Sequence, residues 1–211
     1  MKSFVATLLT VLFLCALSRC ALAMGSKPIM EPFQGMKNVT EWAHEIAAKD
    51  DIKQFDKKFT SPNEWFAMLE RQKPHWGANR KPITLEYLKW LNKQINHSFK
   101  YEYTAQTYGK EYTATPNEIL AKGVGDCKAA VTLKYFALAK LGFKPWEINI
   151  FEGYYVKGQT QPQGHRVLVV TLNGKFYVMD IMSDNVVEAK DYMNRDFMPK
   201  HRLDNKRVSI W

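Results

Sequence analysis

Apolar and polar residues follow a helical spacing through the first two thirds of the chain, and capping residues mark where helices begin. Asn38 followed by Glu41 predicts a helix over residues 38–49. Residues 61–64, Ser-Pro-Asn-Glu, combine a cap residue, a proline at the first helical position and a glutamate facing back, so they predict a second helix. Two prolines and a glycine within residues 73–82 indicate a loop.

Three further helices are predicted before the pattern changes. One begins at Thr84 and has apolar residues on one side. The next follows residues 115–118, Thr-Pro-Asn-Glu, and stops at Gly123. The last covers residues 127–141 and is apolar around most of its surface, which is typical of a helix buried at the centre of a domain.

Beyond Gly142 the pattern becomes that of β-strands. Residues 146–151 are predicted to form one strand and residues 166–172, rich in valine and leucine, another, and residues 175–181 are expected to pair with the second of them. Asn173-Gly174 lies between these two and is the strongest short signal for a tight hairpin turn. Helices followed by an antiparallel sheet place the chain in the α+β class.

Residues 1–23 have the composition of a secretory signal peptide. A lysine precedes an apolar run over residues 4–17, and Ala21-Leu22-Ala23 fits a cleavage site. We expect cleavage after Ala23 rather than a lipoprotein anchored at Cys20, because an arginine directly precedes that cysteine. The apolar run is too short for a comfortable membrane span.

Removal of this signal is expected to leave residues 24–211 as a single periplasmic domain, long enough to bury a hydrophobic core. No other stretch is long and apolar enough to span a membrane, and the net charge falls from +9 to +7. The basic residues are scattered and are not interleaved with aromatic residues, so we expect no nucleic-acid partner.

The mature chain retains one cysteine, Cys127. A lone cysteine in an oxidising compartment is expected to be either buried or used. Cys127 begins the predicted buried helix, directly after Gly-Val-Gly-Asp. The N–H groups and partial positive charge of a helix N-terminus stabilise a thiolate and the oxyanion of acyl transfer. Cys127 is therefore the candidate nucleophile, and an inert buried cysteine is the alternative.

A cysteine nucleophile needs a base, and the hairpin register points to His165. If residues 173–174 form a two-residue turn, Val167 faces Asp180 on the partner strand. His165 and Val167 point to the same side of their strand because side chains alternate. Asp180 is then a diagonal neighbour of His165 on one face of the sheet, where its carboxylate can orient the imidazole.

Asp184 is the alternative orienting residue, because in the same register it lies diagonal to His165 on the other side. A turn that was one residue longer would shift the register and remove both pairings. No pair of histidine, cysteine or acidic residues has the spacing of zinc ligands, so we expect no structural metal.

Several blocks of the sequence resemble one family. They are residues 115–118, 123–127 (Gly-Val-Gly-Asp-Cys), 134–138 with 141–142, 165–168 (His-Arg-Val-Leu), Asp180 with 183–186, and Tyr192, Phe197, Pro199 and Trp211. Together they resemble the bacterial transglutaminase-like cysteine peptidases, the family of LapG-like periplasmic proteases. The resemblance runs from about Leu88 to the end of the chain.

This resemblance implies a papain-like core, in which the helix bearing Cys127 packs on an antiparallel sheet bearing His165 and Asp180. It implies an exported cysteine endopeptidase with a Cys-His-Asp triad. The implied substrate is a large cell-surface adhesin, whose cleavage in the family releases a biofilm. The implied regulator is an inner-membrane receptor for cyclic di-GMP that sequesters the protease.

The chain departs from the family pattern beside the cysteine. In the family, acidic residues that follow the cysteine help to bind calcium, whereas this chain has Lys128 and Ala129 there. Asp126 is retained and is a candidate calcium ligand. A hard cation wants several oxygen ligands, so we expect no cofactor and no calcium dependence. Arg166 and Ile181 are also unusual for the family.

Three functions remain open at this point. The first is peptide hydrolysis. The second is transglutaminase-type amide transfer, which uses the same nucleophile. The third is a catalytically inactive binding module of the same fold, suggested by the lost acidic pair. Tyr108, Tyr112 and Asp126 are candidates for bordering the substrate cleft or for the oxyanion hole.

Overall fold

The computed structural model describes residues 38–49 and 83–210. The predicted signal peptide, the helix predicted at residues 61–64 and the loop predicted over residues 73–82 lie outside the described residues. The helices are α2 (Val39–Lys49), α4 (Leu85–Asn96), α5 (Thr104–Tyr108), α6 (Pro116–Lys122), α7 (Cys127–Lys140), the 3-10 turn η2 (Pro145–Glu147) and α8 (Ala189–Tyr192). The strands are β1 (Lys100–Tyr101), β2 (Val124–Gly125), β3 (Ile148–Tyr155), β4 (Gln163–Leu172), β5 (Lys175–Met179), β6 (Val187–Glu188), β7 (Phe197–Leu203) and β8 (Val208–Ile210). Within the described ranges, no helix has the length and apolar composition needed to cross a membrane.

The helix starts follow the capping residues that the sequence indicated. The side chains of Asn38 and Thr84 each accept a hydrogen bond from the backbone N–H three residues further on. At α6, Thr115 and Glu118 form a complete capping box, and the helix ends at Gly123, whose φ of 65° suits a residue without a side chain. These three predicted helices are confirmed, as is the predicted helix that begins with Cys127.

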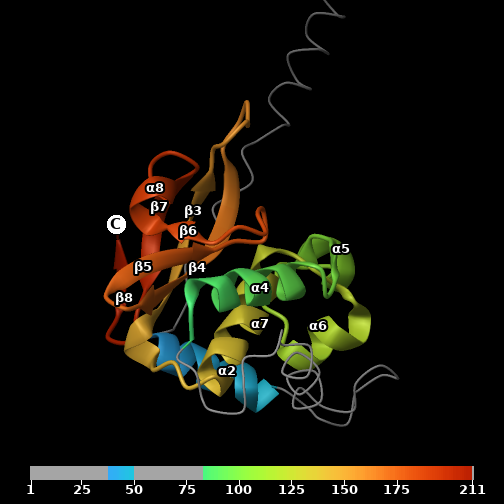
Figure 1. Cartoon of the computed structure of the whole chain (residues 1–211). Helices are drawn as coiled ribbons and strands as arrows, with labels where there is room; N and C mark the ends of the chain where they lie inside the picture. Colours follow the sequence, from blue (N-terminus) through green and yellow to red (C-terminus); the bar gives the residue numbers. More distant parts are fainter. Residues whose placement is uncertain (1–37, 50–82, 211) are drawn as a thin grey trace, which may run out of the picture.

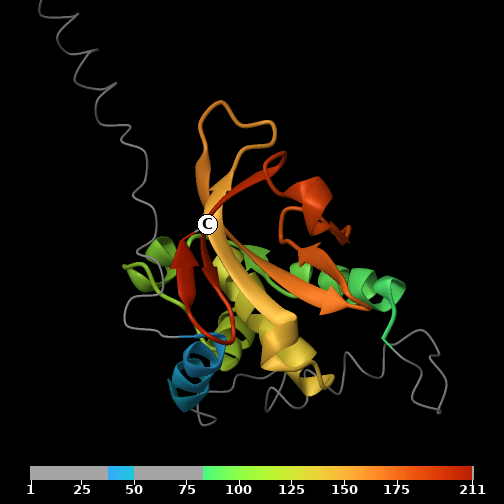
Figure 2. The same cartoon turned by 90° about the vertical axis from the view of Figure 1, so that its left-hand side faces the viewer.

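Six strands form one antiparallel sheet in the order β6-β5-β4-β3-β7-β8, and β1 and β2 form a separate parallel pair. Helices α2, α4, α6 and α7 gather on one side of the large sheet, whereas α8 lies on the other side (Figure 1). Figure 2 shows the same arrangement from the side, with the β3–β4 hairpin projecting beyond the rest of the molecule. The α+β class is confirmed.

The β4–β5 hairpin has the predicted register. Leu168 faces Met179, and Leu172 faces Lys175 across the turn. The two turn residues have positive φ, 51° and 74°, as a type I′ turn requires. The prediction that β5 continues to residue 181 was wrong, because Asp180 leaves the ladder and its carbonyl accepts a hydrogen bond from Asn96 of α4. The strand predicted over residues 146–151 begins instead after η2 and extends to residue 155.

Each face of the large sheet carries its own apolar cluster. Leu168 and Val170 of β4 belong to the cluster that includes α4, α6 and α7. Val167 and Val169 point to the opposite face, where they pack in a smaller cluster with Tyr192 at the end of α8. The alternation of side chains along β4 therefore sends neighbouring residues into different cores.

Helix α7 is buried on nearly all sides and packs against α4, α6 and β4. Its burial includes an ionisable side chain, Lys134, which has no solvent-exposed surface. No hydrogen-bond partner of the Lys134 Nζ lies within the described residues. Burial lowers the pKa of Lys134 to about 7, although the nearby carboxylates of Asp180 and Asp184 act in the opposite direction. The core thus contains an amine that loses its proton near neutral pH.

The buried Lys134 amine predicts a specific dependence of stability on pH. In the unfolded chain a lysine keeps its proton up to a pKa of about 10.4. Between pH 7 and 10 the unfolded state therefore binds more protons than the folded state, so the free energy of unfolding rises with pH, by at most about 1.4 kcal/mol per pH unit. A charged ammonium in the core destabilises the folded state, and this destabilisation is fully present below pH 7. Lys134→Met removes it. We expect the variant to be more stable than the wild type at pH 6 and this advantage to shrink towards pH 10, measured by urea unfolding.

Lys140→Met is the matched control for this experiment, since Lys140 is an exposed lysine in the last turn of the same helix. Its unfolding free energy should follow that of the wild type across the same pH range. If the free energies of unfolding of Lys134→Met and the wild type changed in parallel with pH, Lys134 would be shown to stay protonated in the core, and the prediction would be contradicted.

Candidate active site

Cys127 is the first residue of α7, and the local sequence fixes its position. Asp126 is the N-cap, with its Oδ1 accepting the N–H of Lys128 at 2.9 Å. Before it, Gly125 lies so close to the helix that a Cβ at this position would be 2.4 Å from the Cβ of Ala129. The Gly-Asp-Cys order therefore has a steric and a capping reason, and it leaves the Cys127 side chain 5% exposed.

His165 and Asp180 are in direct contact. The Nε2 of His165 lies 2.6 Å from the Oδ1 of Asp180, and both side chains are almost fully buried. The second carboxylate oxygen, Oδ2, accepts a hydrogen bond from the hydroxyl of Tyr192. Because Asp180 occupies Nε2, the histidine has Nδ1 left for another partner, and Cys127 lies near enough to act on the pKa of the ring.

His165 and Asp180 each stabilise the charged form of the other. Burial alone would lower the pKa of His165, but the Asp180 carboxylate and the hydrogen bond and charge of Cys127 raise it above its usual value. The imidazolium form is thus stabilised inside the protein. Burial acts to raise the pKa of Asp180, but the contact with His165 and the Tyr192 hydroxyl hold it below its ordinary range. Asp180 therefore stays ionised beside the histidine.

Among the described residues, the backbone of β4 at His165 has a strand partner on one side only. Residues 163–167 of β4 pair with β3 but not with β5, since β5 ends opposite residue 168. His165 faces Gly153 on β3, at a point where the β3–β7 register shifts. A Cβ on Gly153 would lie 2.0 Å from a backbone oxygen of β7, so only glycine fits there. The ring of His165 makes edge contacts with Tyr155 and Phe197, with ring centres 5.5 and 6.2 Å away.

Asp184 lies elsewhere. Its carboxylate binds His97 at 2.9 Å, and the structure places no contact between it and His165 among the interactions of the described residues. Two asparagines of α4 hold the segment between Asp180 and Asp184: Asn92 donates to the carbonyls of residues 183 and 184, and Asn96 donates to the carbonyl of Asp180. Helix α4 therefore fixes the backbone on which Asp180 is placed.

Tyr108 and Tyr112, the tyrosines predicted to border the cleft, pack against each other with ring centres 4.8 Å apart. The hydroxyl of Tyr112 donates to the carboxylate of Glu118 on α6, and the ammonium of Lys122 lies over the ring of Tyr108. These contacts attach α5 and its following loop to α6. Asp126, the third weaker candidate, lies directly beside Cys127 as its helix cap.

The sequence of residues 66–207 matches the family described as bacterial transglutaminase-like cysteine proteinase, BTLCP. The chain belongs to this family. It is a transglutaminase-like cysteine peptidase, and a protein is its substrate. A search of curated proteins found no match.

Among solved structures, the peptidase is similar in fold to LapG of Legionella pneumophila. The calcium-bound form of LapG has 20% sequence identity and a TM-score of 0.57, and the match covers 80% of this chain and 87% of LapG. The EGTA-treated form gives the same identity and TM-score, with 80% and 85% covered. At this identity the similarity concerns the fold.

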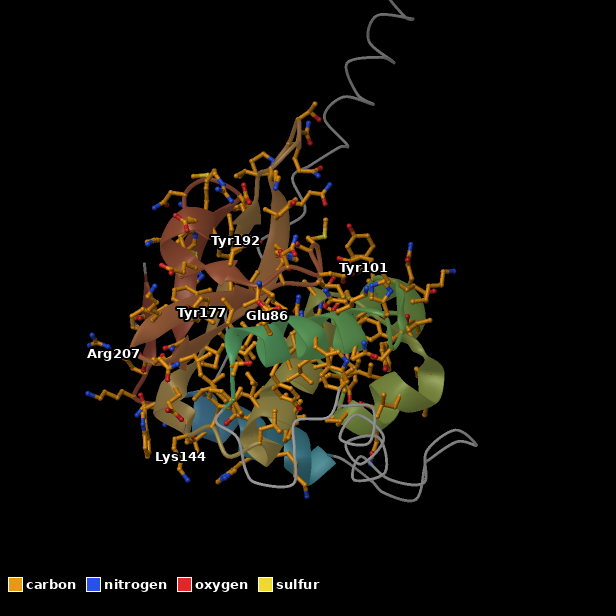
Figure 3. The ribbon with its side chains drawn as sticks, in the orientation of Figure 1. Glu86, Tyr101, Lys144, Tyr177, Tyr192 and Arg207 are labelled. Carbon is orange, nitrogen blue, oxygen red and sulfur yellow. The ribbon has the colours of Figure 1, made fainter. Side chains whose placement is uncertain are left out.

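Two features of the peptidase site were not predicted as site residues. Tyr192 comes from α8, on the sheet side of the molecule, whereas Tyr101 lies on the side of α4 (Figure 3). Tyr101 is 41% exposed, and its pKa is raised by partial burial and by the charge of Cys127 nearby. Alternating aromatic residues at 101 and 103 were the only sequence signal for this exposed pair, whose rings meet edge to face.

Arg166, unusual for the family, also has a structural explanation. It lies opposite Glu152 on β3, and its Nε donates to the glutamate at 2.7 Å. Both side chains are buried. The peptidase therefore carries a buried ion pair directly beside His165, in which each charge offsets the burial of the other.

The Tyr192 hydroxyl should support the His165–Asp180 pair. In Tyr192→Phe one oxygen of the buried Asp180 carboxylate loses its donor, and an unsatisfied buried group of this kind costs about 1–3 kcal/mol. We expect the free energy of unfolding to fall by this amount at pH 7, measured by chemical denaturation. Tyr177→Phe is the control, a tyrosine of β5 that is also largely buried (Figure 3), and it should change stability by less than about 0.5 kcal/mol. Equal losses in the two variants would contradict the role given to Tyr192.

Proposed function

We propose that this cysteine peptidase uses Cys127 as nucleophile, His165 as general base and acid, and Asp180 as the residue that orients the histidine. The observation that carries the proposal is the buried His165–Asp180 contact of 2.6 Å, with Cys127 close to the histidine at the N-terminus of a buried helix. The three residues come from α7, from β4 and from the position directly after β5, so three separate parts of the chain supply complementary groups to one place.

The first half of the reaction forms an acyl-enzyme. The Cys127 thiolate attacks the scissile carbonyl carbon, and the carbonyl oxygen becomes an oxyanion. The N–H of Cys127 is at the first position of α7 and has no acceptor within the helix, so it can donate to that oxyanion. The tetrahedral intermediate collapses, the C–N bond breaks, and protonated His165 gives its proton to the leaving amine.

The second half returns the enzyme to its starting state. Neutral His165 accepts a proton from a water molecule as that water attacks the thioester carbon. The C–S bond then breaks, the carboxylic acid product leaves, and the thiolate–imidazolium pair is restored. Asp180 keeps the imidazole in the tautomer with the proton on Nε2 and stabilises the charged ring.

For the substrate we propose a large cell-surface adhesin, cleaved in the periplasm to control attachment or biofilm release. The resemblance of the Gly-Asp-Cys, His165 and Asp180 blocks to the LapG-like family supports this substrate, and the sequence of residues 1–23 supports export. The same resemblance supports an inner-membrane cyclic di-GMP receptor as the regulator. The fold shared with LapG is consistent with both.

The activated pair can be tested without a substrate. A thiolate reacts with iodoacetamide and a thiol does not, and an ordinary thiol is largely protonated at pH 6. We expect the wild type to react at pH 6 nearly as fast as at pH 9. In His165→Ala, the rate at pH 6 divided by the rate at pH 9 should be about 100-fold lower. The ratio within each variant removes the effect of the limited access to Cys127.

His97→Ala is the control for this measurement, because His97 is an exposed histidine paired with Asp184. It should leave the ratio of rates unchanged. A wild-type ratio typical of an ordinary thiol, and unaffected by His165→Ala, would contradict the catalytic roles proposed for Cys127 and His165.

The substrate proposal needs a separate assay. The mature protein should cleave the N-terminal fragment of a large adhesin from the same cell, and Cys127→Ala should abolish cleavage, as followed by gel electrophoresis and mass spectrometry. Incorporation of a labelled amine at glutamine residues instead would indicate amide transfer. No cleavage of any adhesin from that cell, with the activated thiol present, would contradict the substrate and leave the triad intact.

A further inference from the structure

A buried ammonium group lies beside the cysteine. The Nζ of Lys128 is 2.8 Å from the Oδ2 of Asp126 and 2.6 Å from the Oε2 of Glu111. The Lys128 side chain is 6% exposed, that of Asp126 2%, and that of Glu111 63%. One cation therefore bridges two carboxylates, one in the helix cap and the other in the loop that follows α5.

The bridge belongs to a larger polar cluster. Both the N–H and the hydroxyl of Thr104, at the start of α5, donate to the Oδ2 of Asp126 at 3.3 and 3.2 Å. The Thr104 hydroxyl oxygen also accepts the N–H of Tyr112. The start of α5 and the start of α7 thus meet at the carboxylate of Asp126, and the loop after α5 joins them through Thr104 and Lys128.

Lys128 keeps its charge in this position. Burial acts to lower its pKa, but Asp126 and Glu111 more than offset burial and raise the pKa above the usual value. The two carboxylates carry one negative charge each, so the ammonium neutralises part of the charge that would otherwise repel them.

A calcium ion does not fit this donor set. Calcium takes six to eight oxygen ligands at about 2.3–2.6 Å. The oxygens of Asp126 and Glu111 that face each other already hold an ammonium at hydrogen-bond distance, and the next residue of the helix, Ala129, offers no side-chain oxygen. An ion bound to both oxygens would lie against the Lys128 ammonium and be repelled by it.

We propose that Lys128 is a built-in cation, which takes the place of a divalent metal ion at the start of α7 and positions Asp126 and Cys127 without calcium. Lys128 is thus a positioning residue that acts through the helix cap. Its effect on the reactivity of Cys127 rests on the proposed function, whereas its replacement of a metal ion does not.

The metal part of the proposal is tested on the mature protein by thermal unfolding and calorimetric titration with calcium chloride. We expect the wild type to show no heat of binding and the same unfolding midpoint in EGTA and in millimolar calcium. Lys128→Glu places a third carboxylate beside Asp126 and Glu111, so its midpoint should be lower in EGTA and rise by several degrees with calcium. Micromolar calcium binding by the wild type, or no response of a folded Lys128→Glu protein, would overturn the replacement of a metal by Lys128.

The positioning part uses Lys128→Met, Lys128→Arg and the exposed control Lys140→Met. Leaving two carboxylates without their cation should lower the midpoint of Lys128→Met by at least about 5 °C, and the control should change little.

The ratio of Cys127 alkylation rates at pH 6 and 9 should fall several-fold in Lys128→Met and recover in Lys128→Arg, which restores the charge. If Lys128→Met does not fold, Glu111→Gln removes the exposed carboxylate instead and should give a smaller fall. A ratio equal to that of the wild type in the folded variants would overturn the positioning role, whether or not peptide cleavage is ever found.

Discussion

The register of the β4–β5 hairpin is the constraint on which the site depends. A two-residue turn with both residues at positive φ fixes Leu172 opposite Lys175, and this fixes every pair back along the strands. Asp180 therefore arrives beside His165 rather than on the opposite face. The end of β5 at Met179 then frees Asp180 to bind the histidine, while α4 holds its backbone from the other side. A register shift by one residue would separate the pair although every residue was still present.

Local signals explain why so much of this site could be predicted. Capping residues marked the helices, and one turn dipeptide gave the register that joins His165 to Asp180. Tyr192 and Glu152 were beyond such reasoning, since they reach the site through α8 and through the β3–β4 pairing. That pairing is closed by a long loop with no strong turn signal. The contacts of Lys128 with Glu111 depend in the same way on how a loop folds back onto a helix, which no spacing in the sequence reveals.

Several charged side chains are buried in the two elements that bear Cys127 and His165, α7 and β4, and in their neighbours. The pairs Lys128–Asp126 and Arg166–Glu152 each combine opposite charges at hydrogen-bond distance, so burial is largely compensated. Lys134 differs, since it has only longer-range attraction to carboxylates and no hydrogen-bond partner within the described residues. A site built in this way gives up some stability for a fixed arrangement of charges, as expected where electrostatic preorganisation matters for chemistry.

The 5% exposure of Cys127 also limits the shape of what the peptidase can cut. A residue exposed to so small an extent is easier to reach for an extended segment of chain than for the convex surface of a folded domain. The peptidase would then choose its substrates first by whether a segment is extended and only then by its sequence. A linker between the domains of a substrate protein would be open to attack, and the compact domains on either side of it would be spared.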